Sequence, residues 1–176
     1  MARLSRIHLF AAALSILPGF AWTAELAAPL KPIAFLVGRW EGAGEARDAG
    51  APEHGVSTIS VEADGRALLR SDRTAVAGKP GRPGQSFSQM MMIYAEADGV
   101  HADYVDGEGH VIHYGLASVV AGRSVEFTSA APAGAPVFRL RYDAEGADAL
   151  KVAFMIRPPG APEFQPIAVG EVHRSR

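Results

Sequence analysis

The most informative stretch of the sequence is Phe35-Leu36-Val37-Gly38-Arg39-Trp40-Glu41-Gly42-Ala43-Gly44-Glu45. Three apolar residues precede a Gly-x-Trp motif, and this motif begins a segment with glycine at alternate positions. Successive side chains of a β-strand point to opposite faces, so one face here is small or aromatic. The other face carries Arg39, Glu41 and Glu45. We therefore predict a strand with water on its charged face and close packing on the other.

Turn signals recur through the rest of the chain about every 8–12 residues, a spacing typical of all-β sandwiches and barrels. Several contain Asp-Gly, which suits tight hairpins because glycine accepts a positive φ. The turns are predicted at 48–52, 63–65, 78–84, 97–99, 106–109, 121–122, 130–136, 143–146 and 157–162. They divide the chain after the leader into about ten short strands, the all-β pattern.

Several of these strands alternate cleanly between apolar and polar residues. Phe138, Leu140 and Tyr142 oppose Arg139 and Arg141, and a similar alternation runs through 125–127 and 150–157. Such strands bury one face only, as antiparallel sheets do. No segment shows sustained helical periodicity, although about one helical turn is expected after Leu30–Ile33, in the stretch that leads into the Gly-x-Trp motif. We predict an all-β fold, a single antiparallel up-and-down β-barrel of about ten strands, because closure removes exposed edges. A two-sheet sandwich is the alternative.

Composition excludes several function classes. The chain has 176 residues and a net charge of −2, so no basic surplus indicates nucleic acid or an anionic membrane as a partner. It has no cysteine, which excludes both disulfides and a lipoprotein anchor. The oligomeric state is not indicated.

The N-terminus has the pattern of a secretory signal peptide. Arg3 and Arg6 precede the apolar run Ile7–Leu17, and cleavage is expected after Ala21 or Ala24. The run is too short to span a bilayer, which takes about 20 apolar residues. We expect a signal peptide over 1–24, a barrel domain over 25–176, no membrane span in the mature protein, and a periplasmic or secreted location.

The early Gly-x-Trp motif, followed by short strands alone, resembles the calycin superfamily, which includes lipocalins, fatty-acid-binding proteins and nitrobindin-like barrels. Three further segments, Asp64–Arg70, Asp106–Tyr114 and Pro166–Arg174, resemble a family of bacterial secreted proteins related to nitrobindin-like and fatty-acid-binding-like barrels. The resemblance implies a calycin-like barrel that binds a small apolar or amphipathic molecule. It also implies that Trp40 packs across the closed end, with Arg174 or Arg157 stacked on it as in lipocalins.

The same resemblance bears on haem. Nitrobindin-like proteins bind haem through a histidine of the last strand, and their pattern places Ala168 at that position, whereas His173 falls too late. The axial ligand fixes the iron. We therefore expect no haem and no other cofactor.

The candidate ligand-binding residues are those expected to line the interior or its mouth. Methionine suits an adaptable apolar wall. Fatty-acid-binding barrels hold a carboxylate with internal arginine, although we expect a solvated outer face for the arginines of Arg66–Val76, with an inward arginine as the alternative. The candidates are Trp40, Arg70, Met92, Tyr94, Tyr104, His110 and Tyr114.

No residue pattern indicates catalysis or a metal. His110 and His113 lie three residues apart, so on a strand they point to opposite faces. Glu108 with His110 is an isolated acid–base pair, with no nucleophile elbow, cysteine or phosphate loop to complete a site. We predict a ligand-binding barrel. The alternatives are a filled barrel with a structural or interaction role, or an enzyme that uses His110 or His113 with Tyr104.

Overall fold

The computed structural model describes residues 25–45 and 52–175. The predicted signal peptide, both candidate cleavage sites and most of the first predicted turn lie outside this part of the chain. No helix in the described part is long and apolar enough to cross a membrane.

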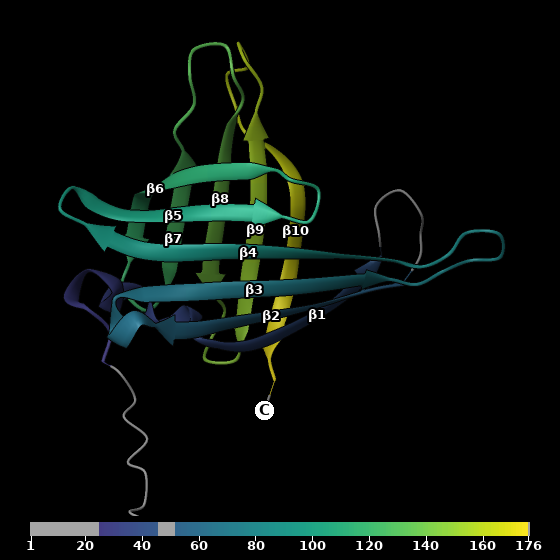
Figure 1. The fold of residues 1–176 in the computed structure, drawn as a ribbon, viewed down its shortest axis with the longest axis horizontal. Helices are drawn as coiled ribbons and strands as arrows, with labels where there is room; N and C mark the ends of the chain where they lie inside the picture. Colours follow the sequence, from purple (N-terminus) through teal and green to yellow (C-terminus); the bar gives the residue numbers. More distant parts are fainter. Residues whose placement is uncertain (1–24, 46–51, 176) are drawn as a thin grey trace, which may run out of the picture.

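Ten antiparallel strands close into a barrel, in the order β1-β10-β9-β8-β7-β6-β5-β4-β3-β2. In Figure 1, β1 to β6 run across the view and β7 to β10 stand upright behind them. Continuous pairing around the barrel confirms the predicted fold and excludes the sandwich alternative. The strands are β1 (Gly38–Glu45), β2 (Pro52–Glu62), β3 (Ala67–Val76), β4 (Gln85–Glu96), β5 (Gly99–Asp106), β6 (Val111–Val120), β7 (Ser124–Ser129), β8 (Val137–Ala144), β9 (Ala149–Arg157) and β10 (Gln165–Arg174).

The alternation seen in the sequence orients the strands as predicted. Phe127, Leu140, Tyr142 and Leu150 are buried in the interior. The charged residues of β8 between them, Arg139 and Arg141, form ion pairs with Glu126 of β7. The hydrophobic core therefore lies inside the barrel, and the outer faces of β7 and β8 carry charged side chains.

A 3₁₀ helix, η1 (Ala28–Leu36), closes this end. It is longer than the single turn predicted. Its buried side chains, Leu30, Ile33 and Leu36, recur every third residue, which is the period of a 3₁₀ helix and not of an α-helix. The indole Nε1 of Trp40 donates a hydrogen bond to the carbonyl oxygen of Leu36 at 2.8 Å. A second short 3₁₀ turn, η2 (Ala63–Gly65), links β2 and β3.

The Gly-x-Trp motif packs against Arg174, the last residue of β10. The guanidinium of Arg174 lies 4.1 Å from the centre of the Trp40 ring, and its Nη1 donates to the carbonyl oxygen of Val37 at 2.8 Å. Gly38 has φ +144°, and a Cβ there would lie 2.1 Å from Arg174 Nη1. The motif therefore needs glycine to admit the arginine. Of the two predicted partners of Trp40, Arg174 is confirmed, whereas Arg157 stacks on Phe164 instead.

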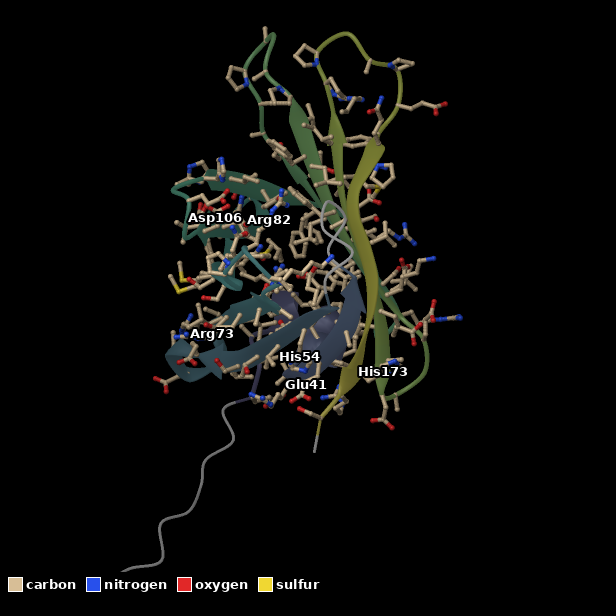
Figure 2. All side chains as sticks on the ribbon, turned by 90° about the vertical axis from the view of Figure 1, so that its right-hand side faces the viewer. Glu41, His54, Arg73, Arg82, Asp106 and His173 are labelled. Atoms are coloured by element: carbon tan, nitrogen blue, oxygen red, sulfur yellow. The ribbon has the colours of Figure 1, made fainter. Side chains whose placement is uncertain are left out.

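The closure between β1 and β10 is short. These strands pair at Trp40 with Arg174 and at Glu41 with His173, whereas β1 pairs with β2 from Gly38 to Glu45. Figure 2 shows Glu41, His54 and His173 near this junction. Beyond it, a groove of about 480 Å³ lies between β10 and the edge formed by β1 and β2. The barrel is thus tight at the Trp40 end and opens away from it.

Candidate functional site

A buried ion pair lies on the inner wall of β3. The side chains of Arg70 and Asp72 are 11% and 13% exposed and form a salt bridge. They share a face with Leu68, which is fully buried. The expectation of a solvated outer face is therefore wrong for Arg70. Leu68 sets the parity of the strand, so the charged residues two and four positions later must also point inward.

Arg70 is fully engaged by protein groups. Its Nε donates to Asp72 Oδ2 at 2.7 Å, and its Nη2 donates to the same oxygen and to Gln89 Oε1 at 3.2 Å. Its Nη1 donates to the hydroxyl of Tyr142 at 2.5 Å and contacts Met91 Sδ at 3.8 Å. Burial alone would lower the pKa of Arg70, but the attraction of Tyr142 and Asp72 outweighs it and the pKa is raised. The guanidinium is charged at every physiological pH, and its five donor hydrogens match these five contacts.

The carboxylate of Asp72 is only half satisfied. Its Oδ2 accepts both bonds from Arg70, while its Oδ1 is buried and has no hydrogen-bond partner. A buried acceptor without a partner costs about 1–3 kcal/mol, and more for a charged group. Buried polar groups are almost always paired, so this oxygen makes the inner ion pair less stabilising than a pair bonded through both carboxylate oxygens.

A cavity of about 150 Å³ lies beside this ion pair. Its wall combines a polar patch on β2 and β3 with apolar side chains from β9 and β10. Gly55 leaves room within it, since a Cβ there would come no closer than 3.7 Å to Thr74 Oγ1. The lining residues are Trp40, Gly55, Val56, Ser57, Arg70, Asp72, Thr74, Tyr142, Leu150, Val152 and Val172. Of the predicted ligand-binding residues, Trp40 and Arg70 lie here.

Three tyrosines surround the ion pair. Burial raises the pKa of Tyr142 and of Tyr114, both of which are 3% exposed. Burial and the neighbouring carboxylate of Asp106 raise the pKa of Tyr104, whose hydroxyl donates to Asp106 Oδ2 at 3.2 Å. All three therefore keep their hydroxyl protons near neutral pH. Tyr104 and Tyr114 belong to the inward faces of β5 and β6, but neither lines the 150 Å³ cavity. Tyr142 was not singled out from the sequence, although its alternation with Arg141 placed it inside.

Met92 and Tyr94 do not line the interior. Met92 is 45% exposed, and Tyr94 donates to Asp103 Oδ2 at 3.0 Å on the outer wall of β4 and β5. Met91, fully buried and in contact with Arg70, takes the inward position instead. The prediction chose the wrong face because both faces of this methionine-rich strand are apolar, so alternation gives no polar marker for the outside.

His110 is a surface residue at the β5–β6 turn, with a side chain that is 66% exposed. Its Nδ1 lies 2.9 Å from Asp106 Oδ2, and this bond raises the pKa of His110. His113 lies on the outer face, 2.6 Å from Asp103 Oδ1. Asp106, labelled in Figure 2, thus contacts both Tyr104 and His110. The arrangement does not activate Tyr104, because a tyrosine base needs a lowered pKa and this pKa is raised.

Two hairpins of the described chain carry one histidine and two carboxylates with ligand atoms within 4.8 Å of one another. In each, the histidine already bonds a carboxylate of its own group, His101 with Asp98 and His110 with Asp106. These groups lie on exposed turns and not on the cavity wall.

The inward face of β10 carries Ala168, which pairs with Phe154 of β9. His173 pairs with Glu41 and is 67% exposed, bonded to Glu171 at 3.3 Å. The other histidines of the described chain, His54, His101, His110 and His113, take part in ion pairs with surface carboxylates.

Comparison of the sequence with protein-family models and with curated proteins found no match.

Proposed function

We propose that this protein is an exported, calycin-like barrel that binds a small apolar or amphipathic molecule in its interior. The observation that carries the proposal is the 150 Å³ cavity beside the buried ion pair of Arg70 and Asp72. Export rests on the signal-like pattern of residues 1–24, and a periplasmic or secreted location follows from it. Membership of the family of bacterial secreted barrels rests on the sequence resemblance.

Energetics favours a binding role over a filled barrel. A buried ion pair is often no more stabilising than apolar residues of the same volume. A barrel that only needed a packed interior would therefore have little reason to hold Arg70 and Asp72 there. The cavity also sits where Gly55 has no side chain to fill it. Polar groups placed on an otherwise apolar cavity wall are the usual arrangement of ligand sites.

Native mass spectrometry of protein purified from the periplasm tests the proposal directly. Excess mass that is lost on denaturation would show a bound molecule and allow its identification. The denatured mass would also give the position of signal cleavage. A mass equal to that of the bare chain, together with no thermal stabilisation by any small apolar probe, would contradict the proposal and support a filled barrel.

A cavity-filling variant makes the test specific. Gly55→Val places a branched side chain in the cavity, whereas Gly115→Val makes the same change on β6, where a Cβ would meet nothing within 4 Å. A ligand at 100 times its Kd stabilises a protein by about 2.7 kcal/mol. We expect this stabilisation to persist in Gly115→Val and to vanish in Gly55→Val. Equal stabilisation of both variants would place the ligand elsewhere.

A further inference from the structure

The groove beside β10 and the interior cavity meet at the junction of β1 and β10. Gly55 and Val172 line both spaces. Gly42, which pairs with Gly55 across β1 and β2, also lines the groove. Because Gly42 and Gly55 have no side chains, Val172 is the residue at this border, within the described chain, whose side chain can narrow it. The groove of about 480 Å³ and the cavity of about 150 Å³ therefore adjoin each other at Val172.

This border lies where the barrel is least closed. In the described chain, β1 pairs with β10 only at Trp40 and Glu41. From there β1 runs across the view of Figure 1 while β10 stands upright, so the two strands diverge. A Cβ at Gly42 would lie 3.0 Å from Val172 Cγ1, which places the valine side chain over Gly42 at the narrow end of the gap. Val172 thus separates the groove from the cavity.

Small residues occupy the inner face of β10 beyond Val172. Ala168 and Gly170 point inward, because they pair with the inward residues Phe154 and Val152 of β9. Both line the groove, and a Cβ at Gly170 would meet nothing within 4 Å. Space for a ligand therefore continues along β10 from the gap.

The sizes of the two spaces set the shape of the ligand. A cavity of about 150 Å³ lined by apolar side chains holds a molecule as large as benzene, or about six carbons. The groove adds a second, larger space on the far side of Val172. A molecule that fills both spaces must be elongated, and it must be narrow where it passes this side chain.

The charges along this path disfavour an acid. Glu53 and Glu171 line the groove, and none of its lining residues in the described chain is a lysine or an arginine. In the cavity, Arg70 already donates to Asp72 and to Tyr142. A carboxylate head group in the groove would face like charges, and one in the cavity would compete with these protein acceptors for the guanidinium. A hydroxyl head group meets neither obstacle.

We propose that the groove and the cavity form one site for an elongated, unbranched amphipathic molecule with a non-acidic head group, whose chain passes between β1 and β10 beside Val172. Val172 is a specificity-determining residue, because its side chain sets the width of the passage. This inference rests on the proposed function, since it names the class of ligand and its route into the same interior.

Calorimetric titration of the wild-type protein at neutral pH with 1-butanol, 1-hexanol, 1-octanol and 1-decanol tests the extent of the site. Each methylene group that becomes buried strengthens binding roughly fourfold. Binding in the cavity alone would end this gain at about six carbons. We expect the gain to continue to 1-decanol, and we expect decanoate to bind more weakly than 1-decanol.

A substitution in the groove then locates the outer part of the chain. Gly170→Val adds a branched side chain to the groove, and Gly115→Val makes the same change on β6, where a Cβ also meets nothing within 4 Å. Gly170→Val should bind 1-hexanol like the wild type and lose the additional gain with 1-octanol and 1-decanol. Gly115→Val should bind all four alcohols like the wild type.

The width of the passage is tested with two isomers, 1-octanol and 2-ethyl-1-hexanol. The ethyl branch should weaken binding to the wild type about tenfold or more, because it stops the chain about two methylene groups short of filling the cavity. Val172→Ala should reduce this preference. The matched control is Val61→Ala, at a half-buried valine that packs against the core and lines neither space. Equal affinity of the wild type for both isomers would overturn the role of Val172.

The remaining outcomes separate the two proposals. A gain that ends at 1-hexanol in the wild type, or that continues unchanged in Gly170→Val, would overturn the inference and leave an interior ligand site in place. Tighter binding of decanoate than of 1-decanol would overturn it in favour of a fatty-acid site. Failure of all four alcohols to bind would also overturn the inference, and a bare-chain mass in native spectrometry would then overturn the proposed function as well.

Discussion

The barrel contains the same short pattern twice, with opposite results. Arg70-Ser71-Asp72 of β3 and Arg141-Tyr142-Asp143 of β8 each place an arginine two residues before an aspartate on a strand. The first pair points inward, with side chains 11% and 13% exposed, and the second points outward, with side chains 41% and 33% exposed. The neighbouring apolar residues decide which face each pair takes.

The two pairs also differ in how the carboxylate is used. On the outer wall, Arg141 reaches both oxygens, with Nε donating to Asp143 Oδ2 and Nη2 to Oδ1, each at 2.7 Å. On the inner wall, both bonds from Arg70 go to the single oxygen Oδ2. The outer carboxylate thus accepts through both of its oxygens, and Arg141 also pairs with Glu126, whereas the inner carboxylate accepts from Arg70 through Oδ2 alone.

The largest expected contrast between the pairs is in stability. Arg70→Ala would leave the Asp72 charge buried and unpaired, which typically costs about 3–5 kcal/mol. Arg141→Ala removes a partly exposed pair and should cost about 1 kcal/mol or less. Urea unfolding of both variants measures the difference. Equal losses of unfolding free energy would mean that the inner pair is as well solvated as the outer one.

Removing both members of the inner pair should recover much of the unfolding free energy that Arg70→Ala loses. In Arg70→Met/Asp72→Leu no charge is left buried, and such replacements are often neutral or stabilising by about 1–4 kcal/mol relative to the wild type. The same double change at Arg141 and Asp143 exposes apolar surface and should bring no gain. A double variant as unstable as Arg70→Ala would show that the pair is needed for folding.

A smaller effect is expected from the hydroxyl that supports Arg70. Tyr142→Phe removes the acceptor of the Nη1 bond, and a hydrogen bond to a charged group contributes about 1.5–3 kcal/mol. The control is Tyr94→Phe, which removes a hydroxyl bonded to Asp103 on the outer wall and should leave the unfolding midpoint unchanged. A fall in both midpoints by the same amount would contradict the distinction between inner and outer wall.

Much of the fold was predictable because it follows from local rules. Turn positions follow from Asp-Gly and Pro-Gly chemistry, and strands such as Phe138–Tyr142 carry an apolar face and a charged face that can point only one way. The stacking of Arg174 on Trp40 followed from the Gly-x-Trp motif. The length of η1 was missed because a three-residue period over Leu30, Ile33 and Leu36 is not the helical pattern normally sought.

The site was harder to predict, for a physical reason. A solvated face was expected for the arginines of this strand because an isolated arginine on a strand is usually solvated, and Arg70 was a candidate only as the inward alternative. Its register with Leu68 and its partner Tyr142 on β8 make the inward position possible. Arg70 and Tyr142 lie 72 residues apart in sequence. At Met90–Met92 both faces are apolar, so the wrong one was chosen. His110 was placed in the site for its chemistry, but the turn that holds it lies at the surface.

The smallest expected effect is in titration, and it again separates surface from interior. The bond from Asp106 raises the pKa of His110 above 6.5, so its NMR titration should have a midpoint above that value and return to about 6.5 in Asp106→Asn. A raised folded-state pKa adds stability that is fully present below pH 6.5 and is lost as the pH rises through the folded pKa. His110→Gln assigns the signal.

Inside the barrel, Arg70 and Tyr142 have raised pKa values, so they hold their protons while His110 titrates. A His110 midpoint that stays the same in Asp106→Asn would contradict the assignment of the raised pKa to this bond.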